Sequence, residues 1–220
     1  MLRTISTSLA AAVLLAAMPV AAAPVPVVSG EFRPAEGGCA RRPGGAVFLA
    51  AFTRAVQRRD ATALLALSSP TIQLDFGGGS GQAELRRRLS GAEGRKLWRE
   101  LDRLLAQGCA ARGHNLYLPA VFARDLGDLD PFETLVVTGA AVPLRVAPSA
   151  AARPLRLLSW VAVTPLTGDD YEQPFRRVSL PGGKVTGYVE TAKLRSPLDY
   201  RLVVSRRRGA WKIDAFVAGD

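Results

Sequence analysis

The stretch that decides the fold is YRLVVSRRRGAWKIDAFV, residues 200–217. Apolar side chains alternate at Tyr200, Leu202 and Val204, and they alternate again from Trp211 to Val217. This period places every second side chain on one face of a strand. Because Arg-Arg-Gly-Ala at residues 207–210 can turn between the two halves, the stretch predicts a β-hairpin. The sequence leaves open which sheet receives it.

Composition limits what the rest of the chain can be. The chain has 220 residues, 48% of them hydrophobic and 22% charged, so it can bury the core of one large domain or two small ones. The net charge of +10 comes from scattered arginine runs such as residues 206–208, with no interleaved aromatics and no recognisable nucleic-acid module. We therefore expect a basic surface that faces anionic envelope polymers or lipid head groups, and no nucleic-acid partner.

Residues 1–23 have the features of a secretory signal peptide. Arg3 supplies the positive charge, residues 9–20 form the apolar run, and the alanines at 21–23 suit cleavage. The alternative is a membrane anchor or a buried helix, but the run is shorter than the roughly 20 residues that a membrane span needs. No later segment is long and apolar enough to cross a bilayer. We expect a periplasmic or secreted protein without a transmembrane segment in the mature chain.

Export changes the interpretation of the two cysteines. In an oxidising compartment Cys39 and Cys109 would most simply form a disulfide with each other. The closed loop is long, so this bond would stabilise the fold by roughly 4 kcal/mol. The alternative is two isolated thiols, and no Cys-x-x-Cys spacing points to redox catalysis.

The N-terminal half alternates between helical and extended patterns. Residues 24–45 indicate an irregular leader, and residues 46–59 carry apolar side chains at helical spacing. Asp60 is a plausible N-cap for a short leucine-rich helix that Pro70 would end. A β-branched, alternating strand is then expected over residues 71–76.

The segment LDFGGGSGQAELRRR, residues 74–88, places glycines between that strand and a basic helix. The glycines match neither the dinucleotide-binding G-x-G-x-x-G pattern nor the P-loop. We therefore predict a tight connection from the strand ending at Phe76 to a helix beginning after Gly81. A stronger helix over residues 97–105 would end at Gly108.

Residues 119–131 are predicted to form a solvated acidic loop. Asp125, Asp128 and Asp130 lack the ligand pattern of an EF-hand, and one histidine with two cysteines expected to pair leaves no zinc set. That histidine, His114, is expected in a loop or at a strand edge, and no Gly-x-Ser-x-Gly context supplies a nucleophile. The sequence thus predicts no catalytic residue, no metal site and no cofactor.

The order of a helix, a capped leucine-rich helix, the strand 72–76, glycines and a helix opened by Gly81 resembles the first half of the NTF2-like (SnoaL-like) cone fold. The pattern RGAWKIDAF at residues 208–216 resembles its last strands. The resemblance implies a bent antiparallel sheet around helices, with a central cavity. Asp75 is the candidate for a cavity carboxylate, although its strand could equally turn it to solvent. The family's long antiparallel strands are not expected directly after the first half, where a loop follows.

A second resemblance lies between these pieces. The segments VPLRVAPS at residues 142–149 and GYV at 187–189 are similar to a bacterial SH3 (SH3b) domain, which would cover residues 135–194 as a small β-barrel. SH3b resemblance implies a cell-wall peptide, another envelope polymer or a protein as ligand. Exposed aromatic and arginine side chains carry most recognition energy. The candidate contact residues are Arg145, Trp160, Tyr171 and Tyr188, with barrel core as the alternative role.

Together these patterns predict an α+β chain in which the SH3b-like barrel is inserted into an NTF2-like fold. The expected parts are a signal peptide (1–23), a leader (24–45), an NTF2-like part (46–134), the barrel (135–194) and the final hairpin (195–220), which would complete the NTF2-like sheet. The preferred function is a non-enzymatic, exported binding protein. The alternative is a small-molecule binder, or a hydrolase- or isomerase-like enzyme, that uses the NTF2-like cavity. The oligomeric state is left open.

Overall fold

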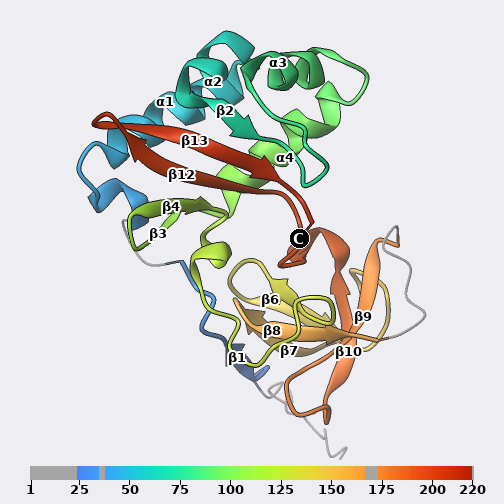
Figure 1. Ribbon diagram of the computed structural model, residues 1–220. Coiled ribbons are helices and arrows are strands. Elements are labelled where there is room, and N and C mark those ends of the chain that lie inside the picture. The colour runs from blue at the N-terminus through green and yellow to red at the C-terminus, as the bar shows by residue number, and fades with distance from the viewer. Residues whose placement is uncertain (1–23, 35–37, 167–172, 220) are drawn as a thin grey trace, which may run out of the picture.

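The computed structural model describes residues 24–34, 38–166 and 173–219, and these form two sheets with helices against one of them (Figure 1). The predicted signal peptide therefore lies outside the described residues. The helices lie on one side of a five-stranded sheet, and an eight-stranded sheet lies beside that unit. The α+β fold class is confirmed.

Four α-helices are described, and three of them follow the expected boundaries closely. Asp60 caps α2 as predicted, because its carboxylate Oδ1 accepts a hydrogen bond from the amide of Ala63 at 2.9 Å. Gly108 follows α4 in the left-handed region, with φ of +76°. The helices are α1 (Gly45–Gln57), α2 (Ala61–Leu67), α3 (Gln82–Ser90) and α4 (Gly94–Ala106), with the short 3-10 helices η1 (Gly38–Arg41), η2 (Ala120–Ala123) and η3 (Thr191–Lys193).

The predicted final hairpin forms and lies in the five-stranded sheet. The strand order is β2 (Ser68–Gln73), β13 (Ala210–Val217), β12 (Arg201–Arg207), β4 (Asn115–Leu118) and β3 (Ala110–Arg112). β13 runs parallel to β2, with Ile213 opposite Ser68, and β12 runs antiparallel to β4. The hairpin thus fills the centre of a sheet whose other strands come from the N-terminal half of the chain.

Two expectations for this half are wrong. Pro70 does not end a helix, because it lies inside β2, which starts at Ser68. β2 is an edge strand, where a residue without an N–H is tolerated. The loop expected after α4 instead begins with the hairpin β3–β4, whose strands of three and four residues are too short for an alternating pattern to appear in the sequence.

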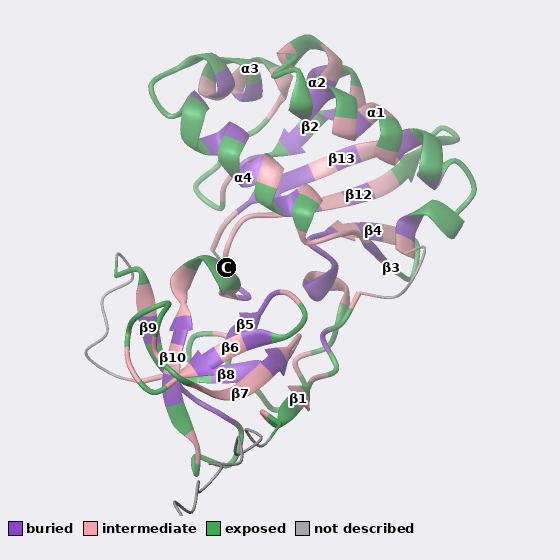
Figure 2. Ribbon diagram, turned by 180° about the vertical axis from the view of Figure 1, so that it is seen from behind, coloured by how far each residue is buried: buried purple, intermediate pink, exposed green. Residues whose placement is uncertain are grey.

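One large apolar core joins the helices to the five-stranded sheet (Figure 2). Phe48 and Phe52 of α1 are buried in the same cluster as Trp98 of α4 and as Trp211 and Ile213 of β13. None of its members comes from residues 135–194. The hairpin is therefore part of the core beneath the helices and not of the core of the eight-stranded sheet.

The eight-stranded sheet contains most of the SH3b-like segment and one strand from the leader. Its strand order is β1 (Val27–Ser29), β7 (Pro154–Ser159), β6 (Val142–Arg145), β10 (Thr186–Glu190), β9 (Phe175–Ser179), β8 (Ala162–Pro165), β5 (Leu135–Val137) and β11 (Leu194–Arg195). The leader is thus not wholly irregular, because β1 pairs in parallel with β7. Within the described ranges the order runs open from β1 to β11, so no closed barrel is found.

The eight-stranded sheet has its own core, made by residues such as Leu144, Leu158, Val178 and Val189. A smaller cluster around Phe32 links the leader and η2 to this sheet. The molecule therefore has separate apolar cores for the two sheets.

The predicted disulfide between Cys39 and Cys109 is confirmed. It ties η1 to the residue that precedes β3, closing a sequence separation of 70 residues. A disulfide fits an oxidising compartment. In the part of the chain that the structure describes, no helix is long and apolar enough to cross a membrane.

Candidate functional site

Two of the predicted contact residues lie side by side on the eight-stranded sheet. Arg145 of β6 is directly opposite Tyr188 of β10, and Tyr188 is opposite Arg177 of β9. Directly paired residues project from the same face of a sheet. Arg145, Tyr188 and Arg177 therefore form a row across three neighbouring strands, which we call the Arg145–Tyr188 row.

Backbone packing holds this row in place. The Arg145 guanidinium Nη1 donates a hydrogen bond to the carbonyl of Ala152, at 2.7 Å, in the loop between β6 and β7. A Cβ atom at Gly187 would lie 2.7 Å from the carbonyl oxygen of Arg145, closer than real contacts allow. Glycine at this position thus permits the backbones of β6 and β10 to approach closely. Tyr188, the next residue on β10, belongs to the row.

The other two predicted contact residues are not part of this row. Trp160 lies between β7 and β8 with φ of +52°, and it packs against the cluster that contains Phe32 and Val121. Its carbonyl accepts a hydrogen bond from the amide of Phe32 at 3.2 Å. Trp160 thus packs against the leader and η2. Tyr171 lies outside the described residues.

A cleft of about 930 Å³ lies at the junction of the two sheets, and we call it the junction cleft. The C-terminal half of α4 forms one wall, and the neighbouring ends of β9 and β10 with the segment 191–199 form the other. Polar and charged side chains project from both walls. They include Arg103, Gln107, Arg176, Glu190, Arg195 and Asp199.

The junction cleft adjoins the Arg145–Tyr188 row, although none of the three row residues lines the cleft itself. Glu190 lies two residues after Tyr188 on β10, so alternation places both on one face. Its partner across the strands is Phe175, and both line the cleft. Ala150 also lines the cleft, and it lies in the same loop as Ala152, whose carbonyl accepts the hydrogen bond from Arg145. A ligand on the row could therefore extend into the cleft.

A buried ion-pair network fixes the charges of the cleft wall. Arg195 of β11 is only 2% exposed, and its Nη1 lies 3.7 Å from Oε2 of Glu100 on α4. Its Nε lies 3.4 Å from Oδ2 of Asp199, and its Nη2 donates to the carbonyl of Tyr200. Burial lowers the pKa of Arg195, and the nearby carboxylates of Asp199 and Glu100 oppose that shift. The network links the eight-stranded sheet to α4.

Two acceptor side chains, those of Gln107 and Glu190, line the cleft. The side-chain oxygen Oε1 of Gln107 is buried and receives no hydrogen bond from the described residues. Glu190 forms no ion pair with a cation of the described ranges. A buried acceptor without a donor is costly, as at Gln107, and the half-buried carboxylate of Glu190 favours a ligand that brings N–H donors. Guanidinium groups beside them favour carboxylates.

The arrangement does not resemble a catalytic constellation or a metal site. His114 lies exposed in the turn between β3 and β4 and does not line the cleft. Among the described residues, no group of three or more His, Cys, Asp or Glu could hold a metal ion. The charged and polar side chains that line the cleft can form ion pairs and hydrogen bonds with a ligand.

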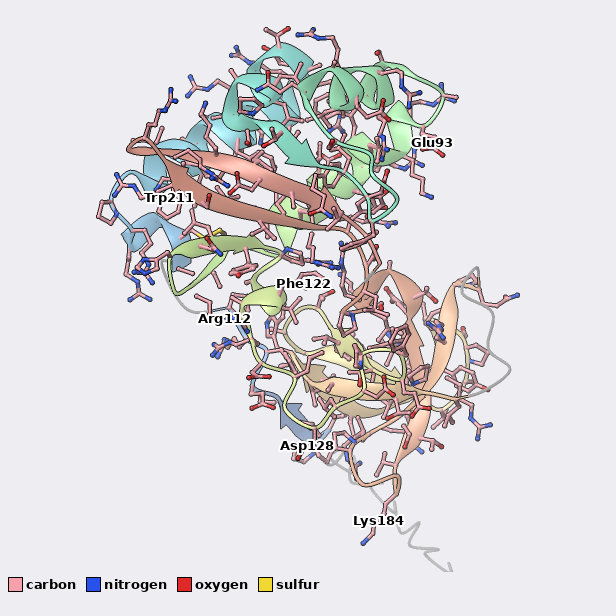
Figure 3. The ribbon with its side chains drawn as sticks, in the orientation of Figure 1. Glu93, Arg112, Phe122, Asp128, Lys184 and Trp211 are labelled. Atoms are coloured by element: carbon pink, nitrogen blue, oxygen red, sulfur yellow. A yellow bond between two sulfur atoms is a disulfide. The ribbon has the colours of Figure 1, made fainter. Side chains whose placement is uncertain are left out.

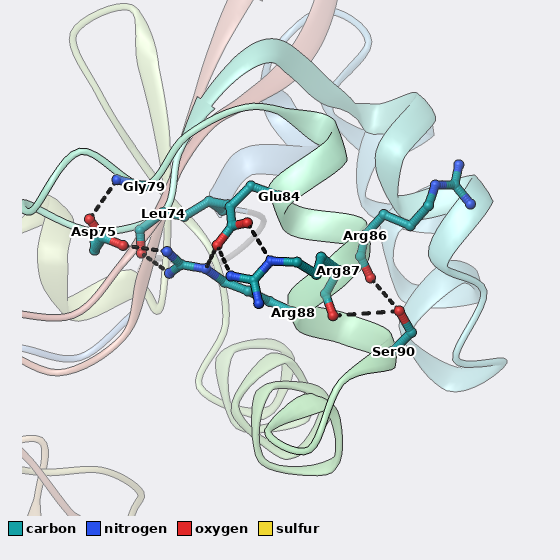
Figure 4. Close-up of polar contacts among 8 residues, drawn as sticks. All are labelled: Leu74, Asp75, Gly79, Glu84, Arg86, Arg87, Arg88 and Ser90. Atoms are coloured by element: carbon teal, nitrogen blue, oxygen red, sulfur yellow. Dashed lines mark hydrogen bonds and ion pairs between the residues drawn. The ribbon is translucent and has the colours of Figure 1, made fainter.

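The glycine segment after β2 is a self-contained turn (Figure 4). Oδ1 of Asp75 accepts hydrogen bonds from the amides of Gly77 and Gly79 at 2.9 and 2.8 Å, and Oδ2 is paired with Arg88. Arg88, followed by the Gly79 amide, lowers the pKa of Asp75. Arg88 Nε also donates to Glu84 at 2.7 Å. The amides that could hold an anion already serve Asp75, and Asp75 lies in a surface turn and not in a cavity.

The core beneath the helices is filled. Phe48, Phe52, Trp98 and Trp211 are all buried in one cluster, and the rings of Phe48 and Phe52 stack with centroids 6.0 Å apart. Together these four side chains fill the space between the helices and the five-stranded sheet, where a central cavity was expected. The geometry therefore favours the junction cleft as the candidate binding site.

Searches against protein-family models, curated proteins and solved structures find no match for this chain. The site is thus argued from its own geometry. Sequence reasoning missed Glu100, although a signal was present: it stands three residues after Leu97 and four before Leu104, on the apolar stripe of α4. The sequence around Gln107 and Arg195 contains no comparable signal, because the two side chains come to line one cleft only through the packing of the two sheets.

Proposed function

We propose that the chain is an exported, non-enzymatic binding protein that contacts a cell-wall peptide through the Arg145–Tyr188 row and the junction cleft. Another envelope polymer or a protein partner would use the same surface. The SH3b resemblance of residues 142–149 and 187–189 supports this class of ligand. The signal-peptide pattern of residues 1–23 supports a periplasmic or secreted location, and the disulfide is compatible with it.

The observation that carries the proposal is that the row and the cleft lie next to each other along β9 and β10. Arg145 offers a guanidinium for a ligand carboxylate, and Tyr188 offers an aromatic face beside it. Further along, Glu190 and Gln107 accept N–H groups. A short peptide with free carboxylate and amino groups supplies both kinds of partner, whereas a purely anionic ligand would leave the acceptors of the cleft unmatched.

We also propose that an SH3b-like unit, residues 135–194, is inserted into an NTF2-like fold. Three features support this arrangement. The hairpin β12–β13 pairs with β2 and β4, which precede residue 135. Trp211 and Ile213 share a core with Phe48, Phe52 and Trp98. The segment 135–194 contributes to a separate core.

Cosedimentation with purified peptidoglycan at low salt tests the proposed function. We expect the wild-type protein to bind, and Tyr188→Ala and Arg145→Ala to weaken binding by about tenfold or more, because each removes a hot-spot type of side chain. Arg99→Ala is the matched control, since Arg99 is exposed on α4 and does not line the cleft. It should bind like wild type.

Titration of a soluble cell-wall peptide separates the two parts of the surface. Glu190→Gln should weaken the peptide with a free amino group and leave its N-acetylated form unchanged, because only the former presents an ammonium to the carboxylate. Absence of peptidoglycan binding by the wild-type protein at low salt would overturn the proposal. Equal loss of binding in Arg99→Ala would also contradict the proposal, since that result would mean that binding depends on net charge alone.

A further inference from the structure

A second polar surface lies away from the junction cleft, at the end of the five-stranded sheet that carries the disulfide. Two depressions of about 410 and 260 Å³ share the residue Arg42 and therefore adjoin each other. Arg206 lines the first, and Arg41 and Arg124 line the second. We call the four residues Arg41, Arg42, Arg124 and Arg206 the arginine band. Arg112 and Trp211 mark this side of the molecule in Figure 3.

Three chain segments that are distant in sequence converge to build the band. The disulfide holds η1, which ends at Arg41, beside β3. Arg42 Nη2 donates to the carbonyl of Gly113 in the β3–β4 turn at 3.2 Å. Arg206 Nη2 donates to the carbonyl of Gly209 at 2.8 Å, and its guanidinium lies 5.8 Å from the centroid of the Trp211 ring. The cations are thus placed by the fold and are not scattered on mobile loops.

Among the described residues, no carboxylate is paired with the positive charge of the band. No carboxylate is among the residues that line either depression. In the described ranges no ion pair involves a member of the band, whereas arginines elsewhere are paired, as in Arg59 with Asp102 and Arg88 with Asp75. Concave surfaces lined by one sign of charge concentrate the field and attract counter-ions. The band is therefore an anion-binding surface.

The form of the surface limits the kind of anion. Guanidinium groups bind phosphate oxygens in bidentate geometry. Val27, Val47, Phe76, Leu129, Phe132 and Val146 are exposed large apolar residues, and none of them lines either depression, so a membrane would lack an apolar anchor there. Trp211 lines the first depression but is buried beside Arg206, so the exposed His114 is the one ring of the lining with a free face, and there is no row of aromatic rings on which successive nucleobases could stack. Two adjoining hollows suit a chain with repeated charges.

We propose that the arginine band binds a linear phosphodiester polymer without nucleobases, at a site separate from the junction cleft. The four arginines pair with successive phosphates along the chain. Such a polymer would hold the protein near an anionic structure while the junction cleft remains open to its own ligand. This inference does not depend on the peptide-binding proposal, because the two surfaces share no lining residue.

Binding of fluorescent poly(glycerol phosphate) to the full chain, followed by anisotropy at several salt concentrations, tests this proposal. We expect Arg42→Ser/Arg206→Ser to raise Kd about tenfold or more and to reduce the salt slope by roughly 2, since each lost phosphate contact removes about one released counter-ion. Arg54→Ser/Arg58→Ser, at exposed positions on α1 and directly after its end, removes the same charge and is the matched control. It should change Kd by less than about threefold at 0.15 M salt, where distant charges are screened.

Circular dichroism checks that each variant is folded, and Arg41→Ser/Arg124→Ser provides a second test in the neighbouring depression. Oligothymidylate with the same number of phosphates and phosphatidylglycerol vesicles are the competing probes. Tighter binding of either probe than of poly(glycerol phosphate) overturns the proposal, and so does an equal loss of affinity in the α1 control. Weaker binding of both probes, with loss confined to the two band variants, supports it.

Discussion

The two sheets use their charged residues in different ways. Helices cover one face of the five-stranded sheet, and several charges on and beside them are paired with one another, as in the pair of Arg59 Nη1 with Asp102 at 2.8 Å. No α-helix of the described residues contributes to the core of the eight-stranded sheet, and that sheet carries the Arg145–Tyr188 row, in which Arg177 is exposed and Arg145 and Tyr188 are half-buried. The comparison indicates that the helix-covered face of the five-stranded sheet supplies stability, whereas the proposed recognition surfaces lie on the eight-stranded sheet and, as the arginine band, at one end of the five-stranded sheet.

The largest expected effect comes from a cavity in either core. Phe52 of α1 and Leu144 of β6 are both 0% exposed, one in each core. Phe52→Ala should lower the free energy of unfolding by about 3–5 kcal/mol, and Leu144→Ala by about 2–5 kcal/mol. Urea unfolding followed by tryptophan fluorescence measures both changes.

Tryptophan positions allow the two cores to be followed separately. Trp98 and Trp211 report on the helix-covered core, and Trp160 lies on the side of the eight-stranded sheet. In a Trp160→Phe background only the first core is observed. If Leu144→Ala shifts that signal as strongly as Phe52→Ala does, the two sheets unfold as one cooperative unit and the division of roles does not extend to stability.

A smaller effect is expected from the ion pair that joins the sheets. Glu100→Gln leaves Arg195 buried with weaker compensation, and we expect a loss of about 3 kcal/mol in the free energy of unfolding. The double variant Glu100→Gln/Arg195→Met should recover part of this loss, because it removes the uncompensated charge. Asp199→Asn, at a more exposed position, is the matched control with a smaller effect. Equal losses in the double and single variants would contradict the coupling across the junction.

The smallest effect is expected from the exposed network on α3. Arg87, followed by Arg88, lowers the pKa of Glu84 to about 2 from its ordinary value of 4.5. The folded carboxylate thus binds protons less readily than the unfolded one, so its stabilising contribution is present above pH 4.5 and is lost as the pH falls toward 2. Glu84→Gln should have a lower urea midpoint than wild type at pH 6, and this difference should shrink steadily down to pH 3. Glu93→Gln, an exposed carboxylate outside the described ion pairs, serves as the control, and a difference that grows on acidification contradicts the expected direction.

Local features of the fold were predictable from the sequence because their causes are local. The apolar period of α1, the cap at Asp60 and the alternation of the final hairpin each depend on a few neighbouring residues. The strand β1 was not predictable, because three residues carry no period and β1 is defined by its pairing with β7.

The candidate site was predictable only in part. Arg145 and Tyr188 were identified by residue type and come together, since they belong to neighbouring strands. The junction cleft could not be predicted, because it forms where α4 meets the ends of β9 and β10 and depends on how two sheets are placed.

The central position of the final hairpin has a consequence during synthesis. Trp211 donates its indole N–H to the carbonyl of Pro43, which lies 168 residues earlier in the chain. At ribosomal rates of about 5–20 residues per second, roughly 10–30 s separate the two ends of this contact. Throughout that interval the apolar faces of α1 and α4 lack the strands that cover them. The nascent chain therefore needs protection from aggregation until its last strands emerge, and a truncated transcript would yield a product with that face permanently uncovered.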